Sequence, residues 1–262
     1  MLRSMYSGIS GMKGFQQKLD VVGNNISNVN TTGFKKGRVT FQDLMSQTSR
    51  GAQAPTNARG GVNPMQVGLG SQVGSIDNTH GQGFRQSTDR PLDFAIEGNG
   101  MFVVHDGNTE FYTRAGNFYL DQDGTIVNAD GYILQGEDGE IEIPLDAQSF
   151  SVDKDGVVNY VDTDGEPQVA GQIQLANFTN PEGLEKAGNN LYLASANSGN
   201  ATIVNPNTEG AGEVVSNALE MSNVDLAEEF TEMITAQRGF QSNTKIITTS
   251  DEILQELVNL KR

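Results

Sequence analysis

Apolar residues recur at helical spacing at both ends of the chain, and this pattern is absent from its middle. Steps of three and four residues place side chains on one stripe of a helix. The N-terminal stripe consists of Leu2, Met5, Ile9, Met12, Leu19, Val22, Ile26 and Val29. The C-terminal stripe consists of Leu226, Phe230, Met233, Phe240, Ile247 and Leu254. The sequence therefore predicts a long amphipathic helix in each terminal segment, 1–30 and 222–262.

Two such helices have two possible sets of partners for their apolar stripes. They can pair with each other as a coiled coil and with copies from neighbouring molecules. They can equally fold onto the core of their own chain, which is the usual meaning of an amphipathic helix. Periodicity alone does not choose between an assembling chain and a globular monomer.

The centre of the chain, residues 73–221, has the pattern of a β-rich domain. Short runs of β-branched and aromatic residues, such as Met101–His105 and Gly156–Val161, are separated by polar turns. Five of the turns end in Asp-Gly, whose glycine supplies the positive φ of a tight hairpin. They end at Gly124, Gly131, Gly139, Gly156 and Gly165. The predicted fold is α+β, with long terminal helices paired as a coiled coil and a central all-β, antiparallel domain inserted between them.

The segment 31–72 reads as an extended connection followed by a linker. Its first part, Phe34 to Leu44, alternates apolar and polar residues like a strand. From Thr48 to Gly74 the chain is rich in Gly, Ala, Asn and Gln and contains two prolines. Such a composition predicts little structure of its own.

Charge is distributed unevenly along the chain. The net charge is −16, and residues 51–221 carry 24 Asp and Glu against six Lys and Arg. Residues 1–50 are basic instead, with seven Lys and Arg against two acidic residues. An acidic centre without a basic stripe excludes nucleic acid as a partner. The simpler interpretation is a solvated acidic surface that keeps the protein in solution. The more specific interpretation is an assembly in which the ends pack inside and the acidic centre faces water.

The residues needed for catalysis or metal binding are sparse. The only histidines are His80 and His105, and the chain has no Cys, so thiolate chemistry is excluded. None of the Asp-Gly turns completes the ligand pattern of a calcium loop. We expect no catalytic site, no cofactor and no metal. The apolar runs are far shorter than a membrane span and the N-terminus does not read as a cleavable signal, so no membrane insertion is expected.

Several motifs resemble one known family. Leu19–Lys35, LDVVGNNISNVNTTGFK, resembles the N-terminal signature of the bacterial flagellar rod and hook proteins. Ser222–Asn243, which contains SNVDL and MITAQRGFQSN, is similar to their C-terminal signature, and LDFAIEGNGMF and YTRAGNF resemble their β-domain. The motif residues that we single out are Asn24, Asn25, Asn28, Gly33, Phe34, Asn223, Gln237 and Arg238.

The resemblance implies a structural subunit of the bacterial flagellum that is needed for motility and polymerises into a helical tube. The implied partners are copies of the chain itself, adjacent flagellar rod, hook-cap and hook–filament junction proteins, and the flagellar type III export apparatus. It also implies a place in the hook or basal body, outside the cytoplasm, reached without a cleavable signal peptide.

Two positions within the family, and one function outside it, fit the sequence. Gly23 and the closing Leu257–Leu260 favour a short hook protein, which joins the basal-body rod to the filament. The chain length and the linker favour the alternative, a distal rod subunit of the basal body. A different class, an exported wall-active hydrolase that uses the acidic residues, is the remaining alternative.

Overall fold

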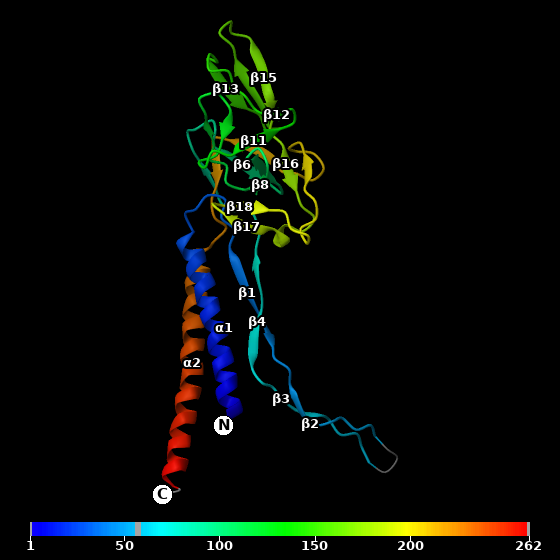
Figure 1. Ribbon diagram of the computed structural model, residues 1–262, viewed down its shortest axis with the longest axis vertical. Helices are drawn as coiled ribbons and strands as arrows, with labels where there is room; N and C mark the ends of the chain where they lie inside the picture. The colour runs from blue at the N-terminus through cyan, green and yellow to red at the C-terminus, as the bar shows by residue number, and fades with distance from the viewer. Residues whose placement is uncertain (1, 56–58, 261–262) are drawn as a thin grey trace. The chain divides into compact units, whose positions relative to one another are not determined.

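The chain folds into two compact units in a computed structural model that describes residues 2–55 and 59–260, except for the side chain of Leu2. Unit 1 contains Met1–Ser27, Gly37–Asp77 and Asp225–Arg262, and unit 2 contains Asn28–Lys36 and Asn78–Val224. Each unit is therefore assembled from segments that are distant in sequence. Both terminal helices belong to unit 1, and the β-rich centre forms unit 2 (Figure 1).

Unit 1 contains the two predicted helices, α1 (Leu2–Ser27) and α2 (Leu226–Asn259). They lie side by side and antiparallel (Figure 1): Met12 contacts Thr244, whereas Lys18, later in α1, contacts Glu232, earlier in α2. The helices are shorter than the predicted segments. Val29 follows α1 rather than lying on it, and the helix α2 begins only after Asp225.

Asp225 defines the start of α2 by capping it. Its side-chain oxygen Oδ1 accepts hydrogen bonds from the backbone N–H groups of Ala227 and Glu228, at 2.8 and 3.4 Å. Glu228 and Glu229 follow in the first turn, where negative charge is favoured by the helix dipole. These local interactions explain why the helix begins here, four residues into the family-like motif.

The remainder of unit 1 is a long two-stranded ribbon in place of the expected unstructured linker. Strands β1 (Gly37–Asp43) and β4 (Ser71–Asn78) pair with each other, and further along the chain β2 (Gln47–Arg50) pairs antiparallel with β3 (Met65–Val67). An additional bridge joins Gln53 to Val62. The prediction of little structure was wrong for these residues. Their strands are mostly exposed on both faces, so backbone pairing forms them without the alternating burial that a sequence pattern reports.

Unit 2 is an antiparallel β-structure with one short 3₁₀ helix, η1 (Pro181–Gly183). Its largest sheet has the order β17-β18-β8-β7-β11-β10-β9, with β12 paired to β11 and β16 paired to both β7 and β19. A separate three-stranded sheet has the order β13-β14-β15, and two further pairs are β20 with β6 and β21 with β5. The strands are β5 (Arg85–Ser87), β6 (Phe94–Glu97), β7 (Met101–His105), β8 (Glu110–Thr113), β9 (Tyr119–Leu120), β10 (Ile126–Val127), β11 (Ile133–Gly136), β12 (Gly139–Glu140), β13 (Ser149–Val152), β14 (Val157–Val161), β15 (Pro167–Gln172), β16 (Leu175–Asn177), β17 (Glu185–Gly188), β18 (Leu191–Leu193), β19 (Thr202–Val204), β20 (Glu213–Ser216) and β21 (Ala218–Glu220).

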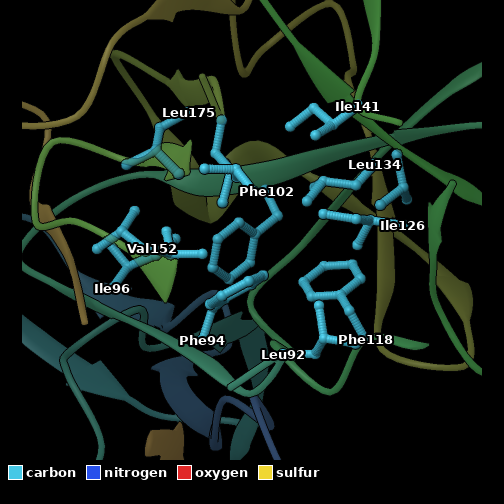
Figure 2. Close-up of a cluster of buried hydrophobic side chains, with 14 of the residues drawn as sticks. Leu92, Phe94, Ile96, Phe102, Phe118, Ile126, Leu134, Ile141, Val152 and Leu175 are labelled. Atoms are coloured by element: carbon cyan, nitrogen blue, oxygen red, sulfur yellow. The ribbon is translucent and has the colours of Figure 1, made fainter. Parts of the chain in front are cut away.

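The core of unit 2 is built around three phenylalanines. Phe94, Phe102 and Phe118 are fully buried, with ring centroids 5.4 to 6.4 Å apart (Figure 2). Strand β7 is buried on both faces: Phe102 points into this cluster, whereas Val103 belongs to a second cluster with Tyr112. Burial on both faces explains why β7 is a continuous apolar run rather than an alternating one.

The five Asp-Gly turns are confirmed. Each glycine has a positive φ, between 76° and 113°. In the turn from Asp121, for example, the Gly124 N–H donates to the Asp121 carbonyl at 3.0 Å. Gly124 has a second reason to be glycine, because a Cβ there would lie 2.1 Å from the carbonyl oxygen of Ile143. These turns set the register of the meander, as their sequence predicted.

Candidate functional site

Two groups of buried polar residues lie close in sequence to the end of α1 and to the start of α2. One group is in unit 1 and the other is in unit 2. In unit 1, Asn25 lies in the last turns of α1 and is 2% exposed. Its Oδ1 accepts the N–H of Gly37, and its Nδ2 donates to the carbonyl of Gly37, both at 2.9 Å. The same Nδ2 donates to Oε2 of Glu229 on α2 at 3.1 Å. One buried carboxamide thus fixes α1, the start of β1 and α2 to one another.

In unit 2, the central residue of the second group is Glu220, the last residue of β21, shortly before α2. Its Oε1 accepts from Nζ of Lys35 at 2.7 Å and from the N–H of Gly83 at 2.8 Å, and its Oε2 accepts from Nε of Arg114 at 2.5 Å. The Glu220 carbonyl also accepts the N–H of Gly33 at 2.8 Å. Glu220 therefore joins four segments of unit 2. We call Lys35, Arg114 and Glu220 the buried ion cluster.

Arg114 extends the buried ion cluster into the β-structure. Its two terminal nitrogens donate to the carbonyls of Ile96, Gly98 and Gly100, the first two at 3.0 and 2.6 Å. Four of its five N–H groups thus donate to oxygens, as a buried guanidinium requires. Arg114 therefore links the turn between β6 and β7 to the carboxylate of Glu220 through hydrogen bonds.

The charges of the buried ion cluster shift the pKa values of its members. Burial alone would raise the pKa of Glu220, but the opposite charges of Arg114 and Lys35 and their hydrogen bonds lower it below its usual range. The pKa of Lys35 is lowered as well, mainly by burial and further by the nearby charge of Arg114, against the attraction of Glu220. Glu220 is therefore ionised at neutral pH, where it balances one of the two cations.

Asn223 makes a second set of cross-links in unit 2. Its Oδ1 accepts the backbone N–H of Lys36 at 2.8 Å, and its Nδ2 donates to the carbonyls of Thr79 and Gly81, at 2.8 and 3.2 Å. The side chain thus completes the backbone hydrogen bonds of segments that lie on either side of β1 and β4 in sequence. Asn25 and Asn223, one from each terminal motif, perform the same task in different units.

The other motif residues have simpler roles. Gly33 has a φ of +68°, and a Cβ there would lie 2.5 Å from the backbone nitrogen of Ala115, so only glycine fits. Phe34 carries Lys186 Nζ 5.2 Å above its ring centroid, and Asn28 accepts a hydrogen bond from the hydroxyl of Thr31 at 3.1 Å. The remaining three, Asn24, Gln237 and Arg238, are exposed.

Glycines lie where α1 and α2 approach each other. A Cβ added to Gly11 would lie 2.9 Å from Nδ2 of Asn243, and one added to Gly239 would lie 2.6 Å from the ring of Phe15. At Gly8 the corresponding distance to Ile247 is 3.5 Å. These residues allow the helices to approach each other, and apolar periodicity did not identify them because glycine carries no hydrophobic signal.

The predicted apolar stripes are only partly covered within one chain. Val22 is buried, and Leu226 and Phe230 are 40% and 49% exposed. The side chain of Leu2 lies outside the described residues. The remaining stripe residues are partly buried: Met5, Ile9, Met12, Leu19, Ile26, Val29, Met233, Phe240, Ile247 and Leu254. Whether the stripes act as assembly seams stays a prediction.

A longer exposed apolar surface runs along α2 and its C-cap, on more than one side of the helix. We call it the α2 face; it consists of Leu226, Phe230, Ile234, Ile246, Ile253, Leu257, Val258 and Leu260. Each of these side chains is at least 40% exposed. Exposed large apolar side chains in this number on one helix indicate interaction surfaces rather than scattered surface residues.

Comparison with known proteins places these features in one family. The family model described as "Flagella basal body rod protein" matches residues 5–35, and "Flagellar basal body rod FlgEFG protein C-terminal" matches residues 215–260. The model described as "Flagellar hook protein FlgE/F/G D1 domain" matches residues 95–160. The chain is also 61% identical to the flagellar basal-body rod protein FlgG of Bacillus subtilis (strain 168), over the full length of both chains. The chain belongs to the flagellar rod and hook protein family.

Membership of the flagellar rod and hook family makes the chain a structural protein of the bacterial flagellum, as the sequence motifs indicated. Between rod and hook, the comparisons favour the rod. FlgG of Caulobacter vibrioides is 42% identical, with 99% of this chain and all of the relative covered. The hook protein FlgE of Borreliella burgdorferi is 31% identical, and its alignment extends over 441 residues. The comparisons therefore back the distal rod alternative better than the expected hook protein.

The sequence interpretation assigned no role to several residues of the site. Lys35 and Arg114 occur inside the family-like motifs, but nothing local shows that they meet Glu220, which lies far away in sequence. Glu229 was also missed, because an acidic residue in a first helical turn is normally exposed. Within 2–55 and 59–260, no group of three or more potential ligands is placed to hold a metal ion, and no helix combines the length and apolarity needed to cross a bilayer.

Proposed function

We propose that this chain is a subunit of the distal rod of the flagellar basal body and polymerises into a helical tube. Two facts support the proposal: the full-length similarity to basal-body rod proteins and the exposed α2 face. The α2 face is the observation on which the proposal of polymerisation rests. In the tube, α1 and α2 would form a coiled coil with copies from neighbouring subunits. The partners would be further copies, adjacent rod proteins and the flagellar export apparatus.

The physical basis of polymerisation is the uncovered apolar area on α2. Burial of apolar surface contributes about 25 cal/mol per Å², and in a monomer the α2 face stays in water. Contacts that join one surface to a different surface of the next copy do not close, so they generate a helical filament. The side chains of the α2 face would then be covered along the whole tube except at its ends.

The acidic charge of unit 2 is consistent with an outward position in such a tube. Residues 51–221 hold most of the excess negative charge. Charge of one sign on the outside keeps an assembly dispersed, whereas the same charge inside would oppose packing. The proposal therefore assigns the α2 face to subunit contacts and the acidic surface of unit 2 to solvent.

The test measures polymerisation of the purified full-length chain by sedimentation and electron microscopy. The variant Ile253→Ser removes one apolar side chain of the α2 face, and Gln255→Ser changes an exposed polar residue of the same helical turn. We expect tubes with the wild type and with Gln255→Ser, and fewer tubes with Ile253→Ser. Equal polymerisation of the two variants would contradict the role of the α2 face.

A deletion strain separates the remaining alternatives. Loss of a distal rod subunit should leave no complete rod in isolated basal bodies, whereas loss of a hook subunit should leave a rod without a hook. An exported wall hydrolase would instead release fragments from purified peptidoglycan as a monomer. A complete rod in the deletion strain, or turnover of peptidoglycan by the monomer, would reject the proposal.

A further inference from the structure

A cavity of about 220 Å³ lies beside the buried ion cluster in unit 2. Lys35, Arg114 and His80 line it, and Met101 and Phe178 add apolar surface. A volume of this size would hold roughly seven waters at about 30 Å³ each. The cavity is thus large enough for one side chain from outside, with cationic and apolar surface in contact with it.

The charge around this cavity is not balanced by the residues that line it. Lys35 and Arg114 are both buried, and each forms its ion pair with the single carboxylate of Glu220. Among the ion pairs recorded between residues 2–55 and 59–260, neither cation has a second acidic partner. Two buried cations with one carboxylate leave one positive charge without a partner of opposite sign. Such a charge is costly in a protein interior and favours an anion from outside.

His80 adds an unused hydrogen-bonding atom to the same cavity wall. Its Nδ1 is buried and has no hydrogen-bond partner, although the ring packs edge-on against Tyr192 at 5.5 Å. Burial and the charges of Lys35, Lys186 and Arg114 lower the pKa of His80 to about 4, so the ring is neutral near pH 7. A neutral imidazole can present an N–H to an acceptor. Buried polar atoms without partners are rare enough to require an explanation.

We propose that this cavity binds a carboxylate, supplied in the tube by an Asp or Glu side chain of a neighbouring copy. The proposal rests on the function proposed above and names one of its subunit contacts. Charge complementarity identifies the occupant: residues 51–221 carry 24 Asp and Glu, many of them in exposed Asp-Gly turns. The carboxylate would meet Lys35 and His80, and the methylene groups of the acidic side chain would lie against Met101 and Phe178.

The first test uses acetate as the carboxylate probe with the full-length chain near pH 7. Both histidines are labelled for NMR, and acetate is compared with chloride at equal ionic strength. We expect a saturable shift of the His80 signals with acetate alone. His105 is the internal control, because it lies in a turn where its Nδ1 already accepts the N–H of Gly107 at 3.2 Å. No shift, or equal shifts at both histidines or with both salts, would overturn the proposal.

The second test places a carboxylate at the cavity from within the same chain. Thr179 is an exposed lining residue, so Thr179→Glu adds a competing negative charge and Thr179→Gln adds the same bulk without charge. We expect Thr179→Glu to raise the concentration needed for polymerisation roughly tenfold relative to Thr179→Gln, which corresponds to about 1.4 kcal/mol. Equal polymerisation of both variants would overturn the subunit contact. Failure of the wild type to form tubes would instead reject the proposed function, and the acetate test would still decide whether the cavity binds a carboxylate.

Discussion

The two units are held together by different kinds of contact. In unit 2, aromatic and aliphatic side chains such as Phe94, Phe102 and Phe118 are fully buried in a continuous core. In unit 1, the buried apolar side chains among the described residues are Val22 and Ala236. Its other close contacts are made by glycines and by the hydrogen bonds of Asn25.

The difference indicates which unit depends on assembly. Burial of apolar surface is the main favourable term in folding, and unit 2 buries many more apolar side chains than unit 1 does. Unit 1 exposes large apolar side chains on α2 instead. We expect unit 1 to gain much of its stability only when neighbouring copies cover the α2 face, so that folding of the helices and assembly are linked.

The expected effect that involves the most residues is a difference in amide hydrogen exchange between the two units of the monomer. Protection in β7 and β8 should exceed protection in α1 and α2 by about a hundredfold or more, equivalent to about 3 kcal/mol in opening free energy. Mass spectrometry of the exchanged chain, in monomer and in tubes, gives both values. Equally strong protection of the helices in a verified monomer would show that unit 1 does not depend on assembly.

Truncation of a core aromatic residue should lower the stability of unit 2, whereas truncation of an exposed aromatic residue in unit 1 should not. Phe102→Ala should cost about 3–5 kcal/mol in the unfolding free energy of unit 2, because it leaves a cavity in a fully packed cluster. The matched variant Phe230→Ala removes an exposed ring and should change that free energy by less than about 0.5 kcal/mol, while reducing tube yield. Denaturant unfolding and sedimentation measure the two effects. A large loss of unit 2 stability in Phe230→Ala would mean that Phe230 belongs to its core.

Neutralisation of the buried ion cluster tests whether unit 2 also depends on polar contacts. Glu220→Gln leaves Lys35 and Arg114 without a counter-charge and should cost about 3–5 kcal/mol. Glu97→Gln removes an ion pair with Arg85 that is half exposed on both sides, and should cost less than about 1 kcal/mol. Thermal unfolding of both variants compares them directly. Similar losses would show that burial of the cluster adds nothing to its strength.

Acid should destabilise unit 2 through His80. The folded pKa of His80 is lowered from 6.5 to about 4, so between these values the unfolded chain binds a proton that the folded chain does not. The folding stability therefore decreases as the pH falls from above 6.5 to about 4, and this contribution then levels off. His80→Gln should lack the corresponding part of the decrease when urea unfolding is followed across this range. An unchanged pH profile in the variant would refute the assignment.

The smallest effects concern the helix contact of unit 1. Gly239→Ala places a methyl group against the ring of Phe15 and should destabilise the helix pair by about 1–3 kcal/mol. In Gly23→Ala the new methyl group meets no atom within 4 Å, so the variant should stabilise α1 by about 0.5–1 kcal/mol. Helix melting followed by far-UV circular dichroism distinguishes the two. Equal behaviour of both variants would show that the glycine contact does not hold the helices together.

Much of the architecture was determined by local sequence. The terminal helices follow from apolar steps of three and four residues, and the meander of unit 2 follows from five Asp-Gly turns between short apolar runs. These features depend on backbone preferences and on neighbours within a few residues, so a single sequence reveals them. The motifs around Asn25 and Asn223 also identified the family, although not the hydrogen bonds that these residues make.

The tertiary structure decided what local patterns cannot carry. Glu220 meets Lys35 across 185 residues, and Asn25 meets Glu229 across 204, so no window of sequence shows either pair. The β2–β3 hairpin is exposed on both faces and leaves no burial pattern. The close approach of α1 and α2 occurs at glycines, which have no side chain and therefore leave no hydrophobic pattern in the sequence. In each case the interaction exists only once the chain has folded, because it depends on distance in space and on burial rather than on the order of residues.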